Sequence, residues 1–143
     1  MARVKSRDTG PEIALRKALF AMGLRYRLGG HAAGKLLPGK PDIVFVSARV
    51  AVFVDGDYWH GNQWKLRGHK SLEDQLAGVS NRSYWVAKIK RNMERDLRVN
   101  AELKQAGWKV VRIWESAIMK SPTRAAARVA RVVGGRRDIS SHR

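Results

Sequence analysis

Hydrophobic residues recur at helical spacing in three parts of this chain, separated by polar positions. The first part begins at Thr9, which is suited to cap a helix, and ends before Gly23. The second is Ser83–Ala106, which Gly107 stops, and the third is Pro122–Val133. The apolar positions that mark the first two helices are Leu15, Leu19 and Met22, followed by Val86, Ile89, Met93 and Leu97.

Four other segments have the pattern of strands. Ile43–Val46 and Val50–Val54 are β-branched and almost continuously apolar, as expected for strands that are buried on both faces. Trp108–Trp114 is predicted as another strand, and Leu24–Leu28 as a short edge strand. The resulting order αβββαβα predicts an α/β fold with a central mixed sheet flanked by helices.

The segments between these elements are rich in glycine. Gly29–Gly39 is predicted to be a loop, and Gly56–Gly78 a long irregular segment of the kind that is usually functional. A chain of 143 residues is suited to one domain with a real core. We expect residues 1–134 to form this domain and residues 135–143 to be a basic, disordered tail.

The charge of the chain indicates its binding partner. With 29 Lys and Arg against 12 Asp and Glu, the net charge is +17, and such self-repulsion favours a polyanionic partner, above all nucleic acid. General solubility and a ribosomal type of RNA binding are the alternatives. The absence of cysteine excludes disulfides and thiolate zinc sites. With no membrane-length apolar stretch and no signal peptide, we expect a bacterial cytosolic protein without membrane association.

Two carboxylates mark the ends of neighbouring predicted strands. Asp42 follows Pro41 and leads into one strand, and Asp55 closes the next. If the strands pair, the two carboxylates lie close together and offer the oxygen ligands that suit Mg²⁺. The alternative is that both are ordinary turn residues. His60 follows shortly afterwards and is a candidate general base, or else a solvated loop histidine.

Several further polar and aromatic residues have both a functional and an ordinary interpretation. Tyr58 and Trp59 could stack on bases or could anchor the loop. Glu12 fits a capping box but shares a face with the apolar stripe of its helix. Three residues repeat along one face of the long helix, where a solvated surface also explains them: Lys88, Asn92 and Asp96.

Five ordered blocks of this sequence resemble one known family. The chain is similar to the very short patch repair endonucleases, the Vsr-type mismatch nickases with a restriction-endonuclease-like core, over about Lys5–Ile118. The blocks are Ser6-Arg7-Asp8-Thr9-x-x-Glu12, Leu37–Asp42, Val52–His60, Trp85-x-x-Lys88-Ile89-x-x-Asn92-x-x-Arg95-Asp96, and Gly107-Trp108-x-Val110 with Ile113-Trp114-Glu115.

The resemblance implies a role for each candidate. Asp42 and the backbone carbonyl of Val54 would bind Mg²⁺, one or two ions, and His60 would be the general base. Glu12 and Asp96 would support His60 or the waters around the metal. Tyr58 and Trp59 would form an aromatic wedge that enters the DNA, and Met1 would be a further intercalating side chain. The implied DNA-binding residues are Tyr58, Trp59, Lys88, Asn92, Arg7 and Lys40.

The sequence departs from the family at two places. Asp55 stands where the best-known members have a catalytic histidine, so we expect it to be a metal ligand or to orient water. The family's structural zinc site, made of cysteines and a histidine, has no counterpart here, and we expect no structural zinc, with local packing by Trp64 holding the loop. The corresponding positions are Asp57, Asn62, Trp64 and Ser116. The family's N-terminal arm is also largely missing.

These observations predict a monomeric, Mg²⁺-dependent endonuclease that nicks double-stranded DNA near a T:G mismatch. One alternative is a related restriction or recombination endonuclease without mismatch specificity. The other is a non-catalytic nucleic-acid-binding domain that has kept the fold.

Overall fold

Three strands form the central sheet of the protein. We describe a computed structural model that covers residues 8–141, with side chains through residue 136. β4 (Val50–Asp55) lies in the middle, antiparallel to β3 (Ile43–Phe45) and parallel to β5 (Lys109–Trp114). All three strands are rich in β-branched residues, and β3 and β4 are buried along nearly their whole length. The predicted α/β fold with a mixed sheet is confirmed.

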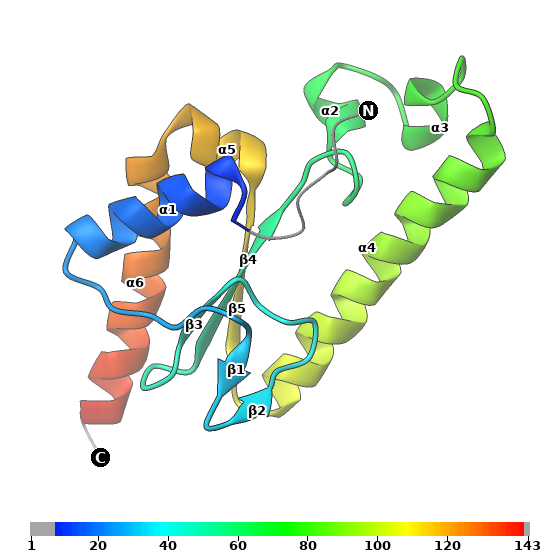
Figure 1. Ribbon diagram of the computed structural model, residues 1–143. Helices are drawn as coiled ribbons and strands as arrows, with labels where there is room; N and C mark the ends of the chain where they lie inside the picture. The colour runs from blue at the N-terminus through cyan, green and yellow to red at the C-terminus, as the bar shows by residue number, and fades with distance from the viewer. Residues whose placement is uncertain (1–7, 142–143) are drawn as a thin grey trace.

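Helices cover both faces of this sheet (Figure 1). α1 (Gly10–Ala21), α5 (Glu115–Lys120) and α6 (Pro122–Ser141) pack together on one face, over a core that includes Leu15, Val52 and Val129. α4 (Arg82–Gln105) lies on the opposite face and packs through Leu103 against Phe53. The alternation of side chains along β4 therefore supplies both cores.

α1 begins and ends where its capping residue and its glycine predict. The hydroxyl of Thr9 accepts a hydrogen bond from the backbone N–H of Glu12 at 3.4 Å, and Gly23 has the positive φ (86°) that ends the helix. The Glu12 carboxylate reaches back to the N–H of Asp8 rather than to that of Thr9. It lies 7% exposed, on the buried face of the helix as its spacing predicts.

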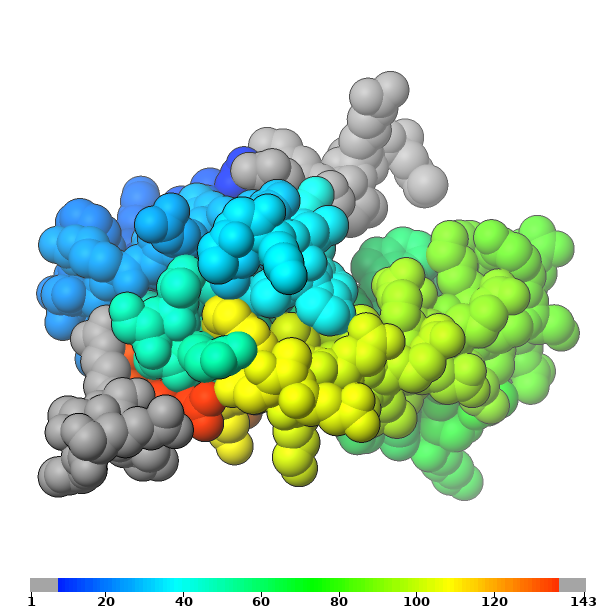
Figure 2. Space-filling model, turned by 90° about the horizontal axis from the view of Figure 1, so that it is seen from below, coloured from blue at the N-terminus to red at the C-terminus, as the bar shows by residue number. Residues whose placement is uncertain are grey.

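The loops contain more structure than their glycines indicate. The predicted loop Gly29–Gly39 includes a small hairpin of β1 (His31–Ala32) and β2 (Lys35–Leu36). Figure 2 shows this segment beside the C-terminal half of α4. The predicted irregular segment Gly56–Gly78 includes two one-turn helices, α2 (Gln63–Leu66) and α3 (Leu72–Gln75). Their side chains pack with the N-terminal half of α4.

Two predicted elements need correction, and one helix has no predicted counterpart. Leu24–Leu28 makes only one isolated bridge, Arg27 to Val44, because the short connection after α1 crosses the edge of β3 at a single point. That helix is α5, because one turn and a half is too short for a periodic signal in the sequence.

The last helix does not end at Val133. α6 continues through Gly134 and Gly135, so the expected start of a disordered tail at residue 135 falls inside a helix. Arg136 donates to the carbonyls of Ala48 and Gly107, at 3.1 and 2.6 Å, and these tertiary bonds hold the helix beyond its two glycines. In residues 8–141, no helix is long and apolar enough to cross a membrane.

Candidate active site

The five residues predicted to act in catalysis line one cavity of about 610 Å³ at the edge of the sheet. They come from four elements that are distant in sequence: the start of α1, the entry to β3, the end of β4 with its following loop, and the middle of α4. Lys40 and Val54 line the same cavity. The five residues are Glu12, Asp42, Asp55, His60 and Asp96.

Asp42 is fixed by the pairing of β3 with β4. Its N–H donates to the carbonyl of Val52 at 2.9 Å, and its Oδ2 accepts from the N–H of Val54 at 2.7 Å. Burial raises the pKa of Asp42 to about 7, and the neighbouring carboxylates of Glu12 and Asp55 act in the same direction, against the bond from Val54. The pocket around Asp42 therefore has an excess of negative charge that a cation would relieve.

Asp55 is bound by an arginine that our sequence analysis did not single out. Arg112 lies on β5, and its Nη1 contacts both carboxylate oxygens of Asp55, at 3.0 and 3.1 Å. Burial raises the pKa of Asp55, while the positive charges of His60 and Arg112 oppose this effect. The signal that could have identified Arg112 is its position as a charged residue between the apolar pairs Val110-Val111 and Ile113-Trp114, in a strand that pairs with the centre of the sheet.

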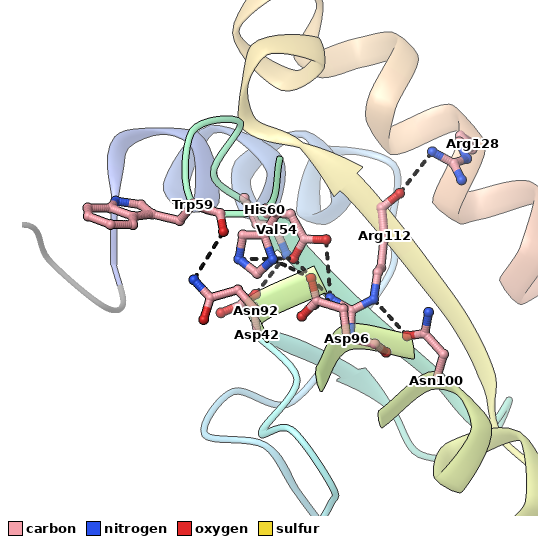
Figure 3. A network of polar contacts seen from close by, with 10 residues as sticks. Asp42, Val54, Trp59, His60, Asn92, Asp96, Asn100, Arg112 and Arg128 are labelled. Carbon is pink, nitrogen blue, oxygen red and sulfur yellow. Dashed lines mark hydrogen bonds and ion pairs between the residues drawn. The ribbon is translucent and has the colours of Figure 1, made fainter. Parts of the chain in front are cut away.

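His60 lies between two carboxylates (Figure 3). Its Nδ1 is 2.5 Å from Asp96 Oδ2, and its Nε2 is 3.9 Å from Asp55 Oδ1. Burial lowers the pKa of His60, but the hydrogen bond to Asp96 and the charges of Asp55 and Asp96 outweigh it, so the pKa is raised above its usual value. The bond to Asp96 favours the tautomer that carries its proton on Nδ1 and leaves Nε2 as the base.

Two groups of donors in this cavity could hold a metal ion. Asp55, His60 and Asp96 each offer a ligand atom, and these atoms lie within 4.8 Å of one another. Arg112, however, already contacts both carboxylates, and its Nη1 is 3.5 Å from Asp96 Oδ1. The side of the cavity around Asp42 has hard oxygen donors, and within residues 8–136 no such cation is in contact with its carboxylate. It therefore fits a divalent ion such as Mg²⁺ better.

Of the residues predicted to contact DNA, Lys40 lines this cavity, whereas Tyr58, Trp59, Lys88 and Asn92 do not. The indole of Trp59 points away from it (Figure 3), 5.7 Å from the ring of Trp85, and the ammonium of Lys88 lies 5.7–6.0 Å from three aromatic rings. Asn92 donates to the carbonyl of Trp59 at 3.1 Å and so holds the loop to α4. Tyr58 packs edge-on against Trp59. The candidates Arg7 and Met1 lie outside the described residues.

A hydrogen-bonded cluster stands where the resemblance would place structural zinc. Asp57 Oδ1 accepts from Asn62 Nδ2 at 2.8 Å and from the hydroxyl of Ser116 at 2.7 Å, and Asp57 Oδ2 accepts from the N–H of Ser116 at 3.0 Å. These bonds tie the loop that carries His60 to the start of α5. The fourth position, Trp64, packs with the apolar cluster of Leu72 and its neighbours, in line with the predicted packing role.

Comparisons with known proteins agree with this geometry. The family model described as "DNA mismatch endonuclease Vsr" matches residues 1–66. The "Type II nicking enzyme V.NmeDIP" of Neisseria meningitidis serogroup C is 43% identical over 136 residues, which are 95% of this chain and 84% of the relative. The chain belongs to the Vsr endonuclease family.

Two further members of the Vsr family are similar over most of their length. The "Type II nicking enzyme V.HpaIIP" of Haemophilus parainfluenzae is 34% identical over 132 residues, 92% of this chain and 86% of the relative. The "DNA mismatch endonuclease Vsr" of Escherichia coli K12 is 31% identical over 118 residues, 82% of this chain and 68% of the relative. The resemblance to the Vsr family and the prediction of a DNA endonuclease are confirmed.

Proposed function

We propose that this chain is a Mg²⁺-dependent nickase that cuts one strand of double-stranded DNA beside a T:G mismatch. We also propose that it acts as a monomer in the bacterial cytosol. The observation that carries the proposal is the convergence of Asp42, His60 and Asp96 from three separate elements on one cavity. Carboxylates that can hold a cation, next to a base that a third carboxylate orients, are the groups that phosphodiester hydrolysis requires.

In this mechanism the carboxylate of Asp42 and the carbonyl of Val54 would hold the ion. When bound, Mg²⁺ would stabilise negative charge on the phosphoryl oxygens. Nε2 of His60 accepts a proton from the attacking water, and Asp96 stabilises the imidazolium through Nδ1. The water oxygen attacks phosphorus in line and the P–O3′ bond breaks, so the products carry a 5′-phosphate and a 3′-hydroxyl. Glu12 adds to the negative field at Asp42 that favours the cation.

The aromatic and basic residues on the neighbouring surface are suited to hold the DNA. We propose that Trp59 and Tyr58 enter the base stack as a wedge, which the edge-on packing of their rings would stiffen. Lys88 lies over the same aromatic cluster and would contact the phosphates or bases next to the wedge. Lys40 at the mouth of the cavity would contact the backbone beside the scissile bond. Asn92 would position the wedge through Trp59.

The substitution Asp42→Ala tests the metal site. We expect the single-turnover rate of nicking in Mg²⁺ to fall about 1,000-fold or more, because the ion loses its carboxylate ligand. DNA affinity, measured without metal, should stay nearly unchanged and salt-sensitive. Glu102→Ala, an exposed acid on α4, is the control. Retained cleavage in the Asp42→Ala variant would refute this assignment.

A second candidate is a nickase that reads a sequence in fully paired DNA. The relatives with 43% and 34% identity carry the name "Type II nicking enzyme", whereas the mismatch endonuclease of E. coli is 31% identical. A panel of matched duplexes, T:G-mismatched duplexes and single-stranded DNA, with the nicks mapped, distinguishes the two. Mismatch repair predicts that T:G duplexes are cut much faster than matched ones, and equal rates favour the second candidate.

A further inference from the structure

Arg112 is the most constrained cation of the described residues around the active site. It lies on β5 in register with Phe53 of β4, and its guanidinium sits over the Phe53 ring, 4.1 Å from its centre. Its side chain is 19% exposed, and Nη1 contacts Asp55 at 3.0 and 3.1 Å and Asp96 at 3.5 Å. One guanidinium therefore joins the two carboxylates between which His60 lies.

The other donors of Arg112 are also directed into the protein. Nε donates to Asn100 Oδ1 at 2.7 Å, and Nη2 lies 3.5 Å from the backbone carbonyl of Asp96. β4, β5 and α4 thus meet at this one side chain (Figure 3). A guanidinium with its donors engaged in this way has little freedom to turn towards a DNA phosphate.

We infer that Arg112 is a positioning residue for strand cleavage, which holds Asp55 and Asp96 so that His60 keeps the orientation of a general base. This inference rests on the proposed function. Asp55 is only 5% exposed, and two carboxylates beside one histidine repel each other unless a cation lies between them. The permanent charge of Arg112 fills that place. It leaves the Asp55–His60–Asp96 cluster without need of a metal ion and directs the divalent ion to Asp42.

The same geometry assigns Asp55 a role that differs from the two the sequence predicted, which were to bind the metal or to orient water. With both oxygens on Nη1 of Arg112, Asp55 is a counterion in the wall of the site rather than a metal ligand. Its Oδ1 lies 3.9 Å from Nε2 of His60, where its negative charge would stabilise the imidazolium that forms when Nε2 accepts the proton. The pair Asp55 and Arg112 therefore acts as a unit.

Four variants of the full chain test the inference: Arg112→Met, Arg112→Lys, the double variant Arg112→Met with Asp55→Asn, and the control Lys109→Met. Lys109 is an exposed cation on the same strand. Each is assayed for single-turnover nicking with saturating enzyme in Mg²⁺, for DNA affinity without metal, and for melting temperature.

We expect Arg112→Met to slow cleavage about 100-fold, because a general base displaced by an ångström loses rate on this scale. DNA affinity should change by no more than about twofold, since the donors of the guanidinium are engaged within the protein. Arg112→Lys should recover part of the rate, to within about tenfold of the wild type, because it keeps the charge without the fork geometry. The double variant should regain the melting temperature lost by Arg112→Met, because no buried carboxylate is left unpaired, but not the rate.

Three results would overturn the inference. If the double variant cleaves like the wild type, Arg112 serves only to neutralise Asp55. If Arg112→Met weakens DNA affinity in proportion to the lost rate, Arg112 is a phosphate contact. If Arg112→Met cleaves like Lys109→Met, it has no part in the reaction. Wild-type protein that cuts no DNA on the panel would instead refute the proposed function itself, so the two failures are distinguishable.

Discussion

The buried carboxyl of Asp42 lowers the stability of the metal-free protein and favours the binding of a cation. Burial and the nearby acids raise its pKa from 3.8 to about 7. Between these two values the folded protein keeps a proton that the unfolded chain has released. Without metal, the contribution of Asp42 to stability is therefore largest at low pH, falls as the pH rises through this window, and levels off above about 7.

The substitution Asp42→Asn should therefore stabilise the metal-free protein, and more so at pH 8 than at pH 5. Asparagine keeps the oxygen that accepts from Val54 but carries no charge. We expect the gain in unfolding free energy to grow by about 3 kcal/mol between these pH values, or about 8 °C in melting temperature. Thermal melts in EDTA measure it, with the exposed Asp74→Asn as the control. An equal gain at both pH values would contradict the assigned cause.

At the scale of elements, the loop between β4 and α2 decides where His60 lies. Asp57 accepts three hydrogen bonds from Asn62 and Ser116, and these bonds connect the loop to the start of α5. Gly61 adds a close approach to α4, because a Cβ at its position would lie 2.5 Å from the sulfur of Met93 at a φ of +78°. Polar and steric constraints thus hold a loop that the family resemblance would hold with zinc.

Asp57→Ala should destabilise this loop. Removing the acceptor leaves the Ser116 N–H and the Asn62 amide without their partner, at a cost of about 2–3 kcal/mol in unfolding free energy. Nicking should fall with it, since His60 shares the loop. Denaturant unfolding and limited proteolysis at Lys65–Arg67 measure the effect, and Glu102→Ala is the matched control. Unchanged proteolysis would show that the cluster does not hold the loop.

At the scale of the whole molecule, the excess of positive charge continues along the outer face of α4. A groove of about 520 Å³ there is lined by Tyr84 and Lys88 near the aromatic cluster and by a row of arginines at helical spacing. These arginines are Arg91, Arg95 and Arg98. Such a row follows on from the cavity, which Arg95 also lines, and is suited to track a phosphate backbone.

Replacing Arg91, Arg95 and Arg98 together by alanine should lower the salt dependence of DNA binding. Each phosphate contact contributes about −0.9 to the slope of log K against log salt, so we expect a slope shallower by about 2–3. Fluorescence anisotropy between 50 and 300 mM salt measures it on matched duplex DNA. Substituting Arg124, Arg128 and Arg131 on α6 gives a control of equal charge. If both triple variants change the slope equally, net charge rather than this groove is responsible.

The sequence by itself determined the elements whose signal is local. The helices α1 and α4 and the strands β3, β4 and β5 follow from apolar periodicity and capping residues, because each depends on neighbours within a few positions. Asp42, His60 and Asp96 could be named because they stand at fixed distances within recognisable blocks. Their convergence on one cavity agrees with the prediction that they form one site.

Only the tertiary structure decided what those residues touch. Arg112 meets Asp55 across 57 positions, and Ser116 meets Asp57 across 59, because β5 pairs with β4 in one particular register. The continuation of α6 beyond its glycines likewise depends on Arg136 reaching the carbonyls of Ala48 and Gly107. Such contacts arise from the pairing and packing of distant segments, which local spacing does not encode.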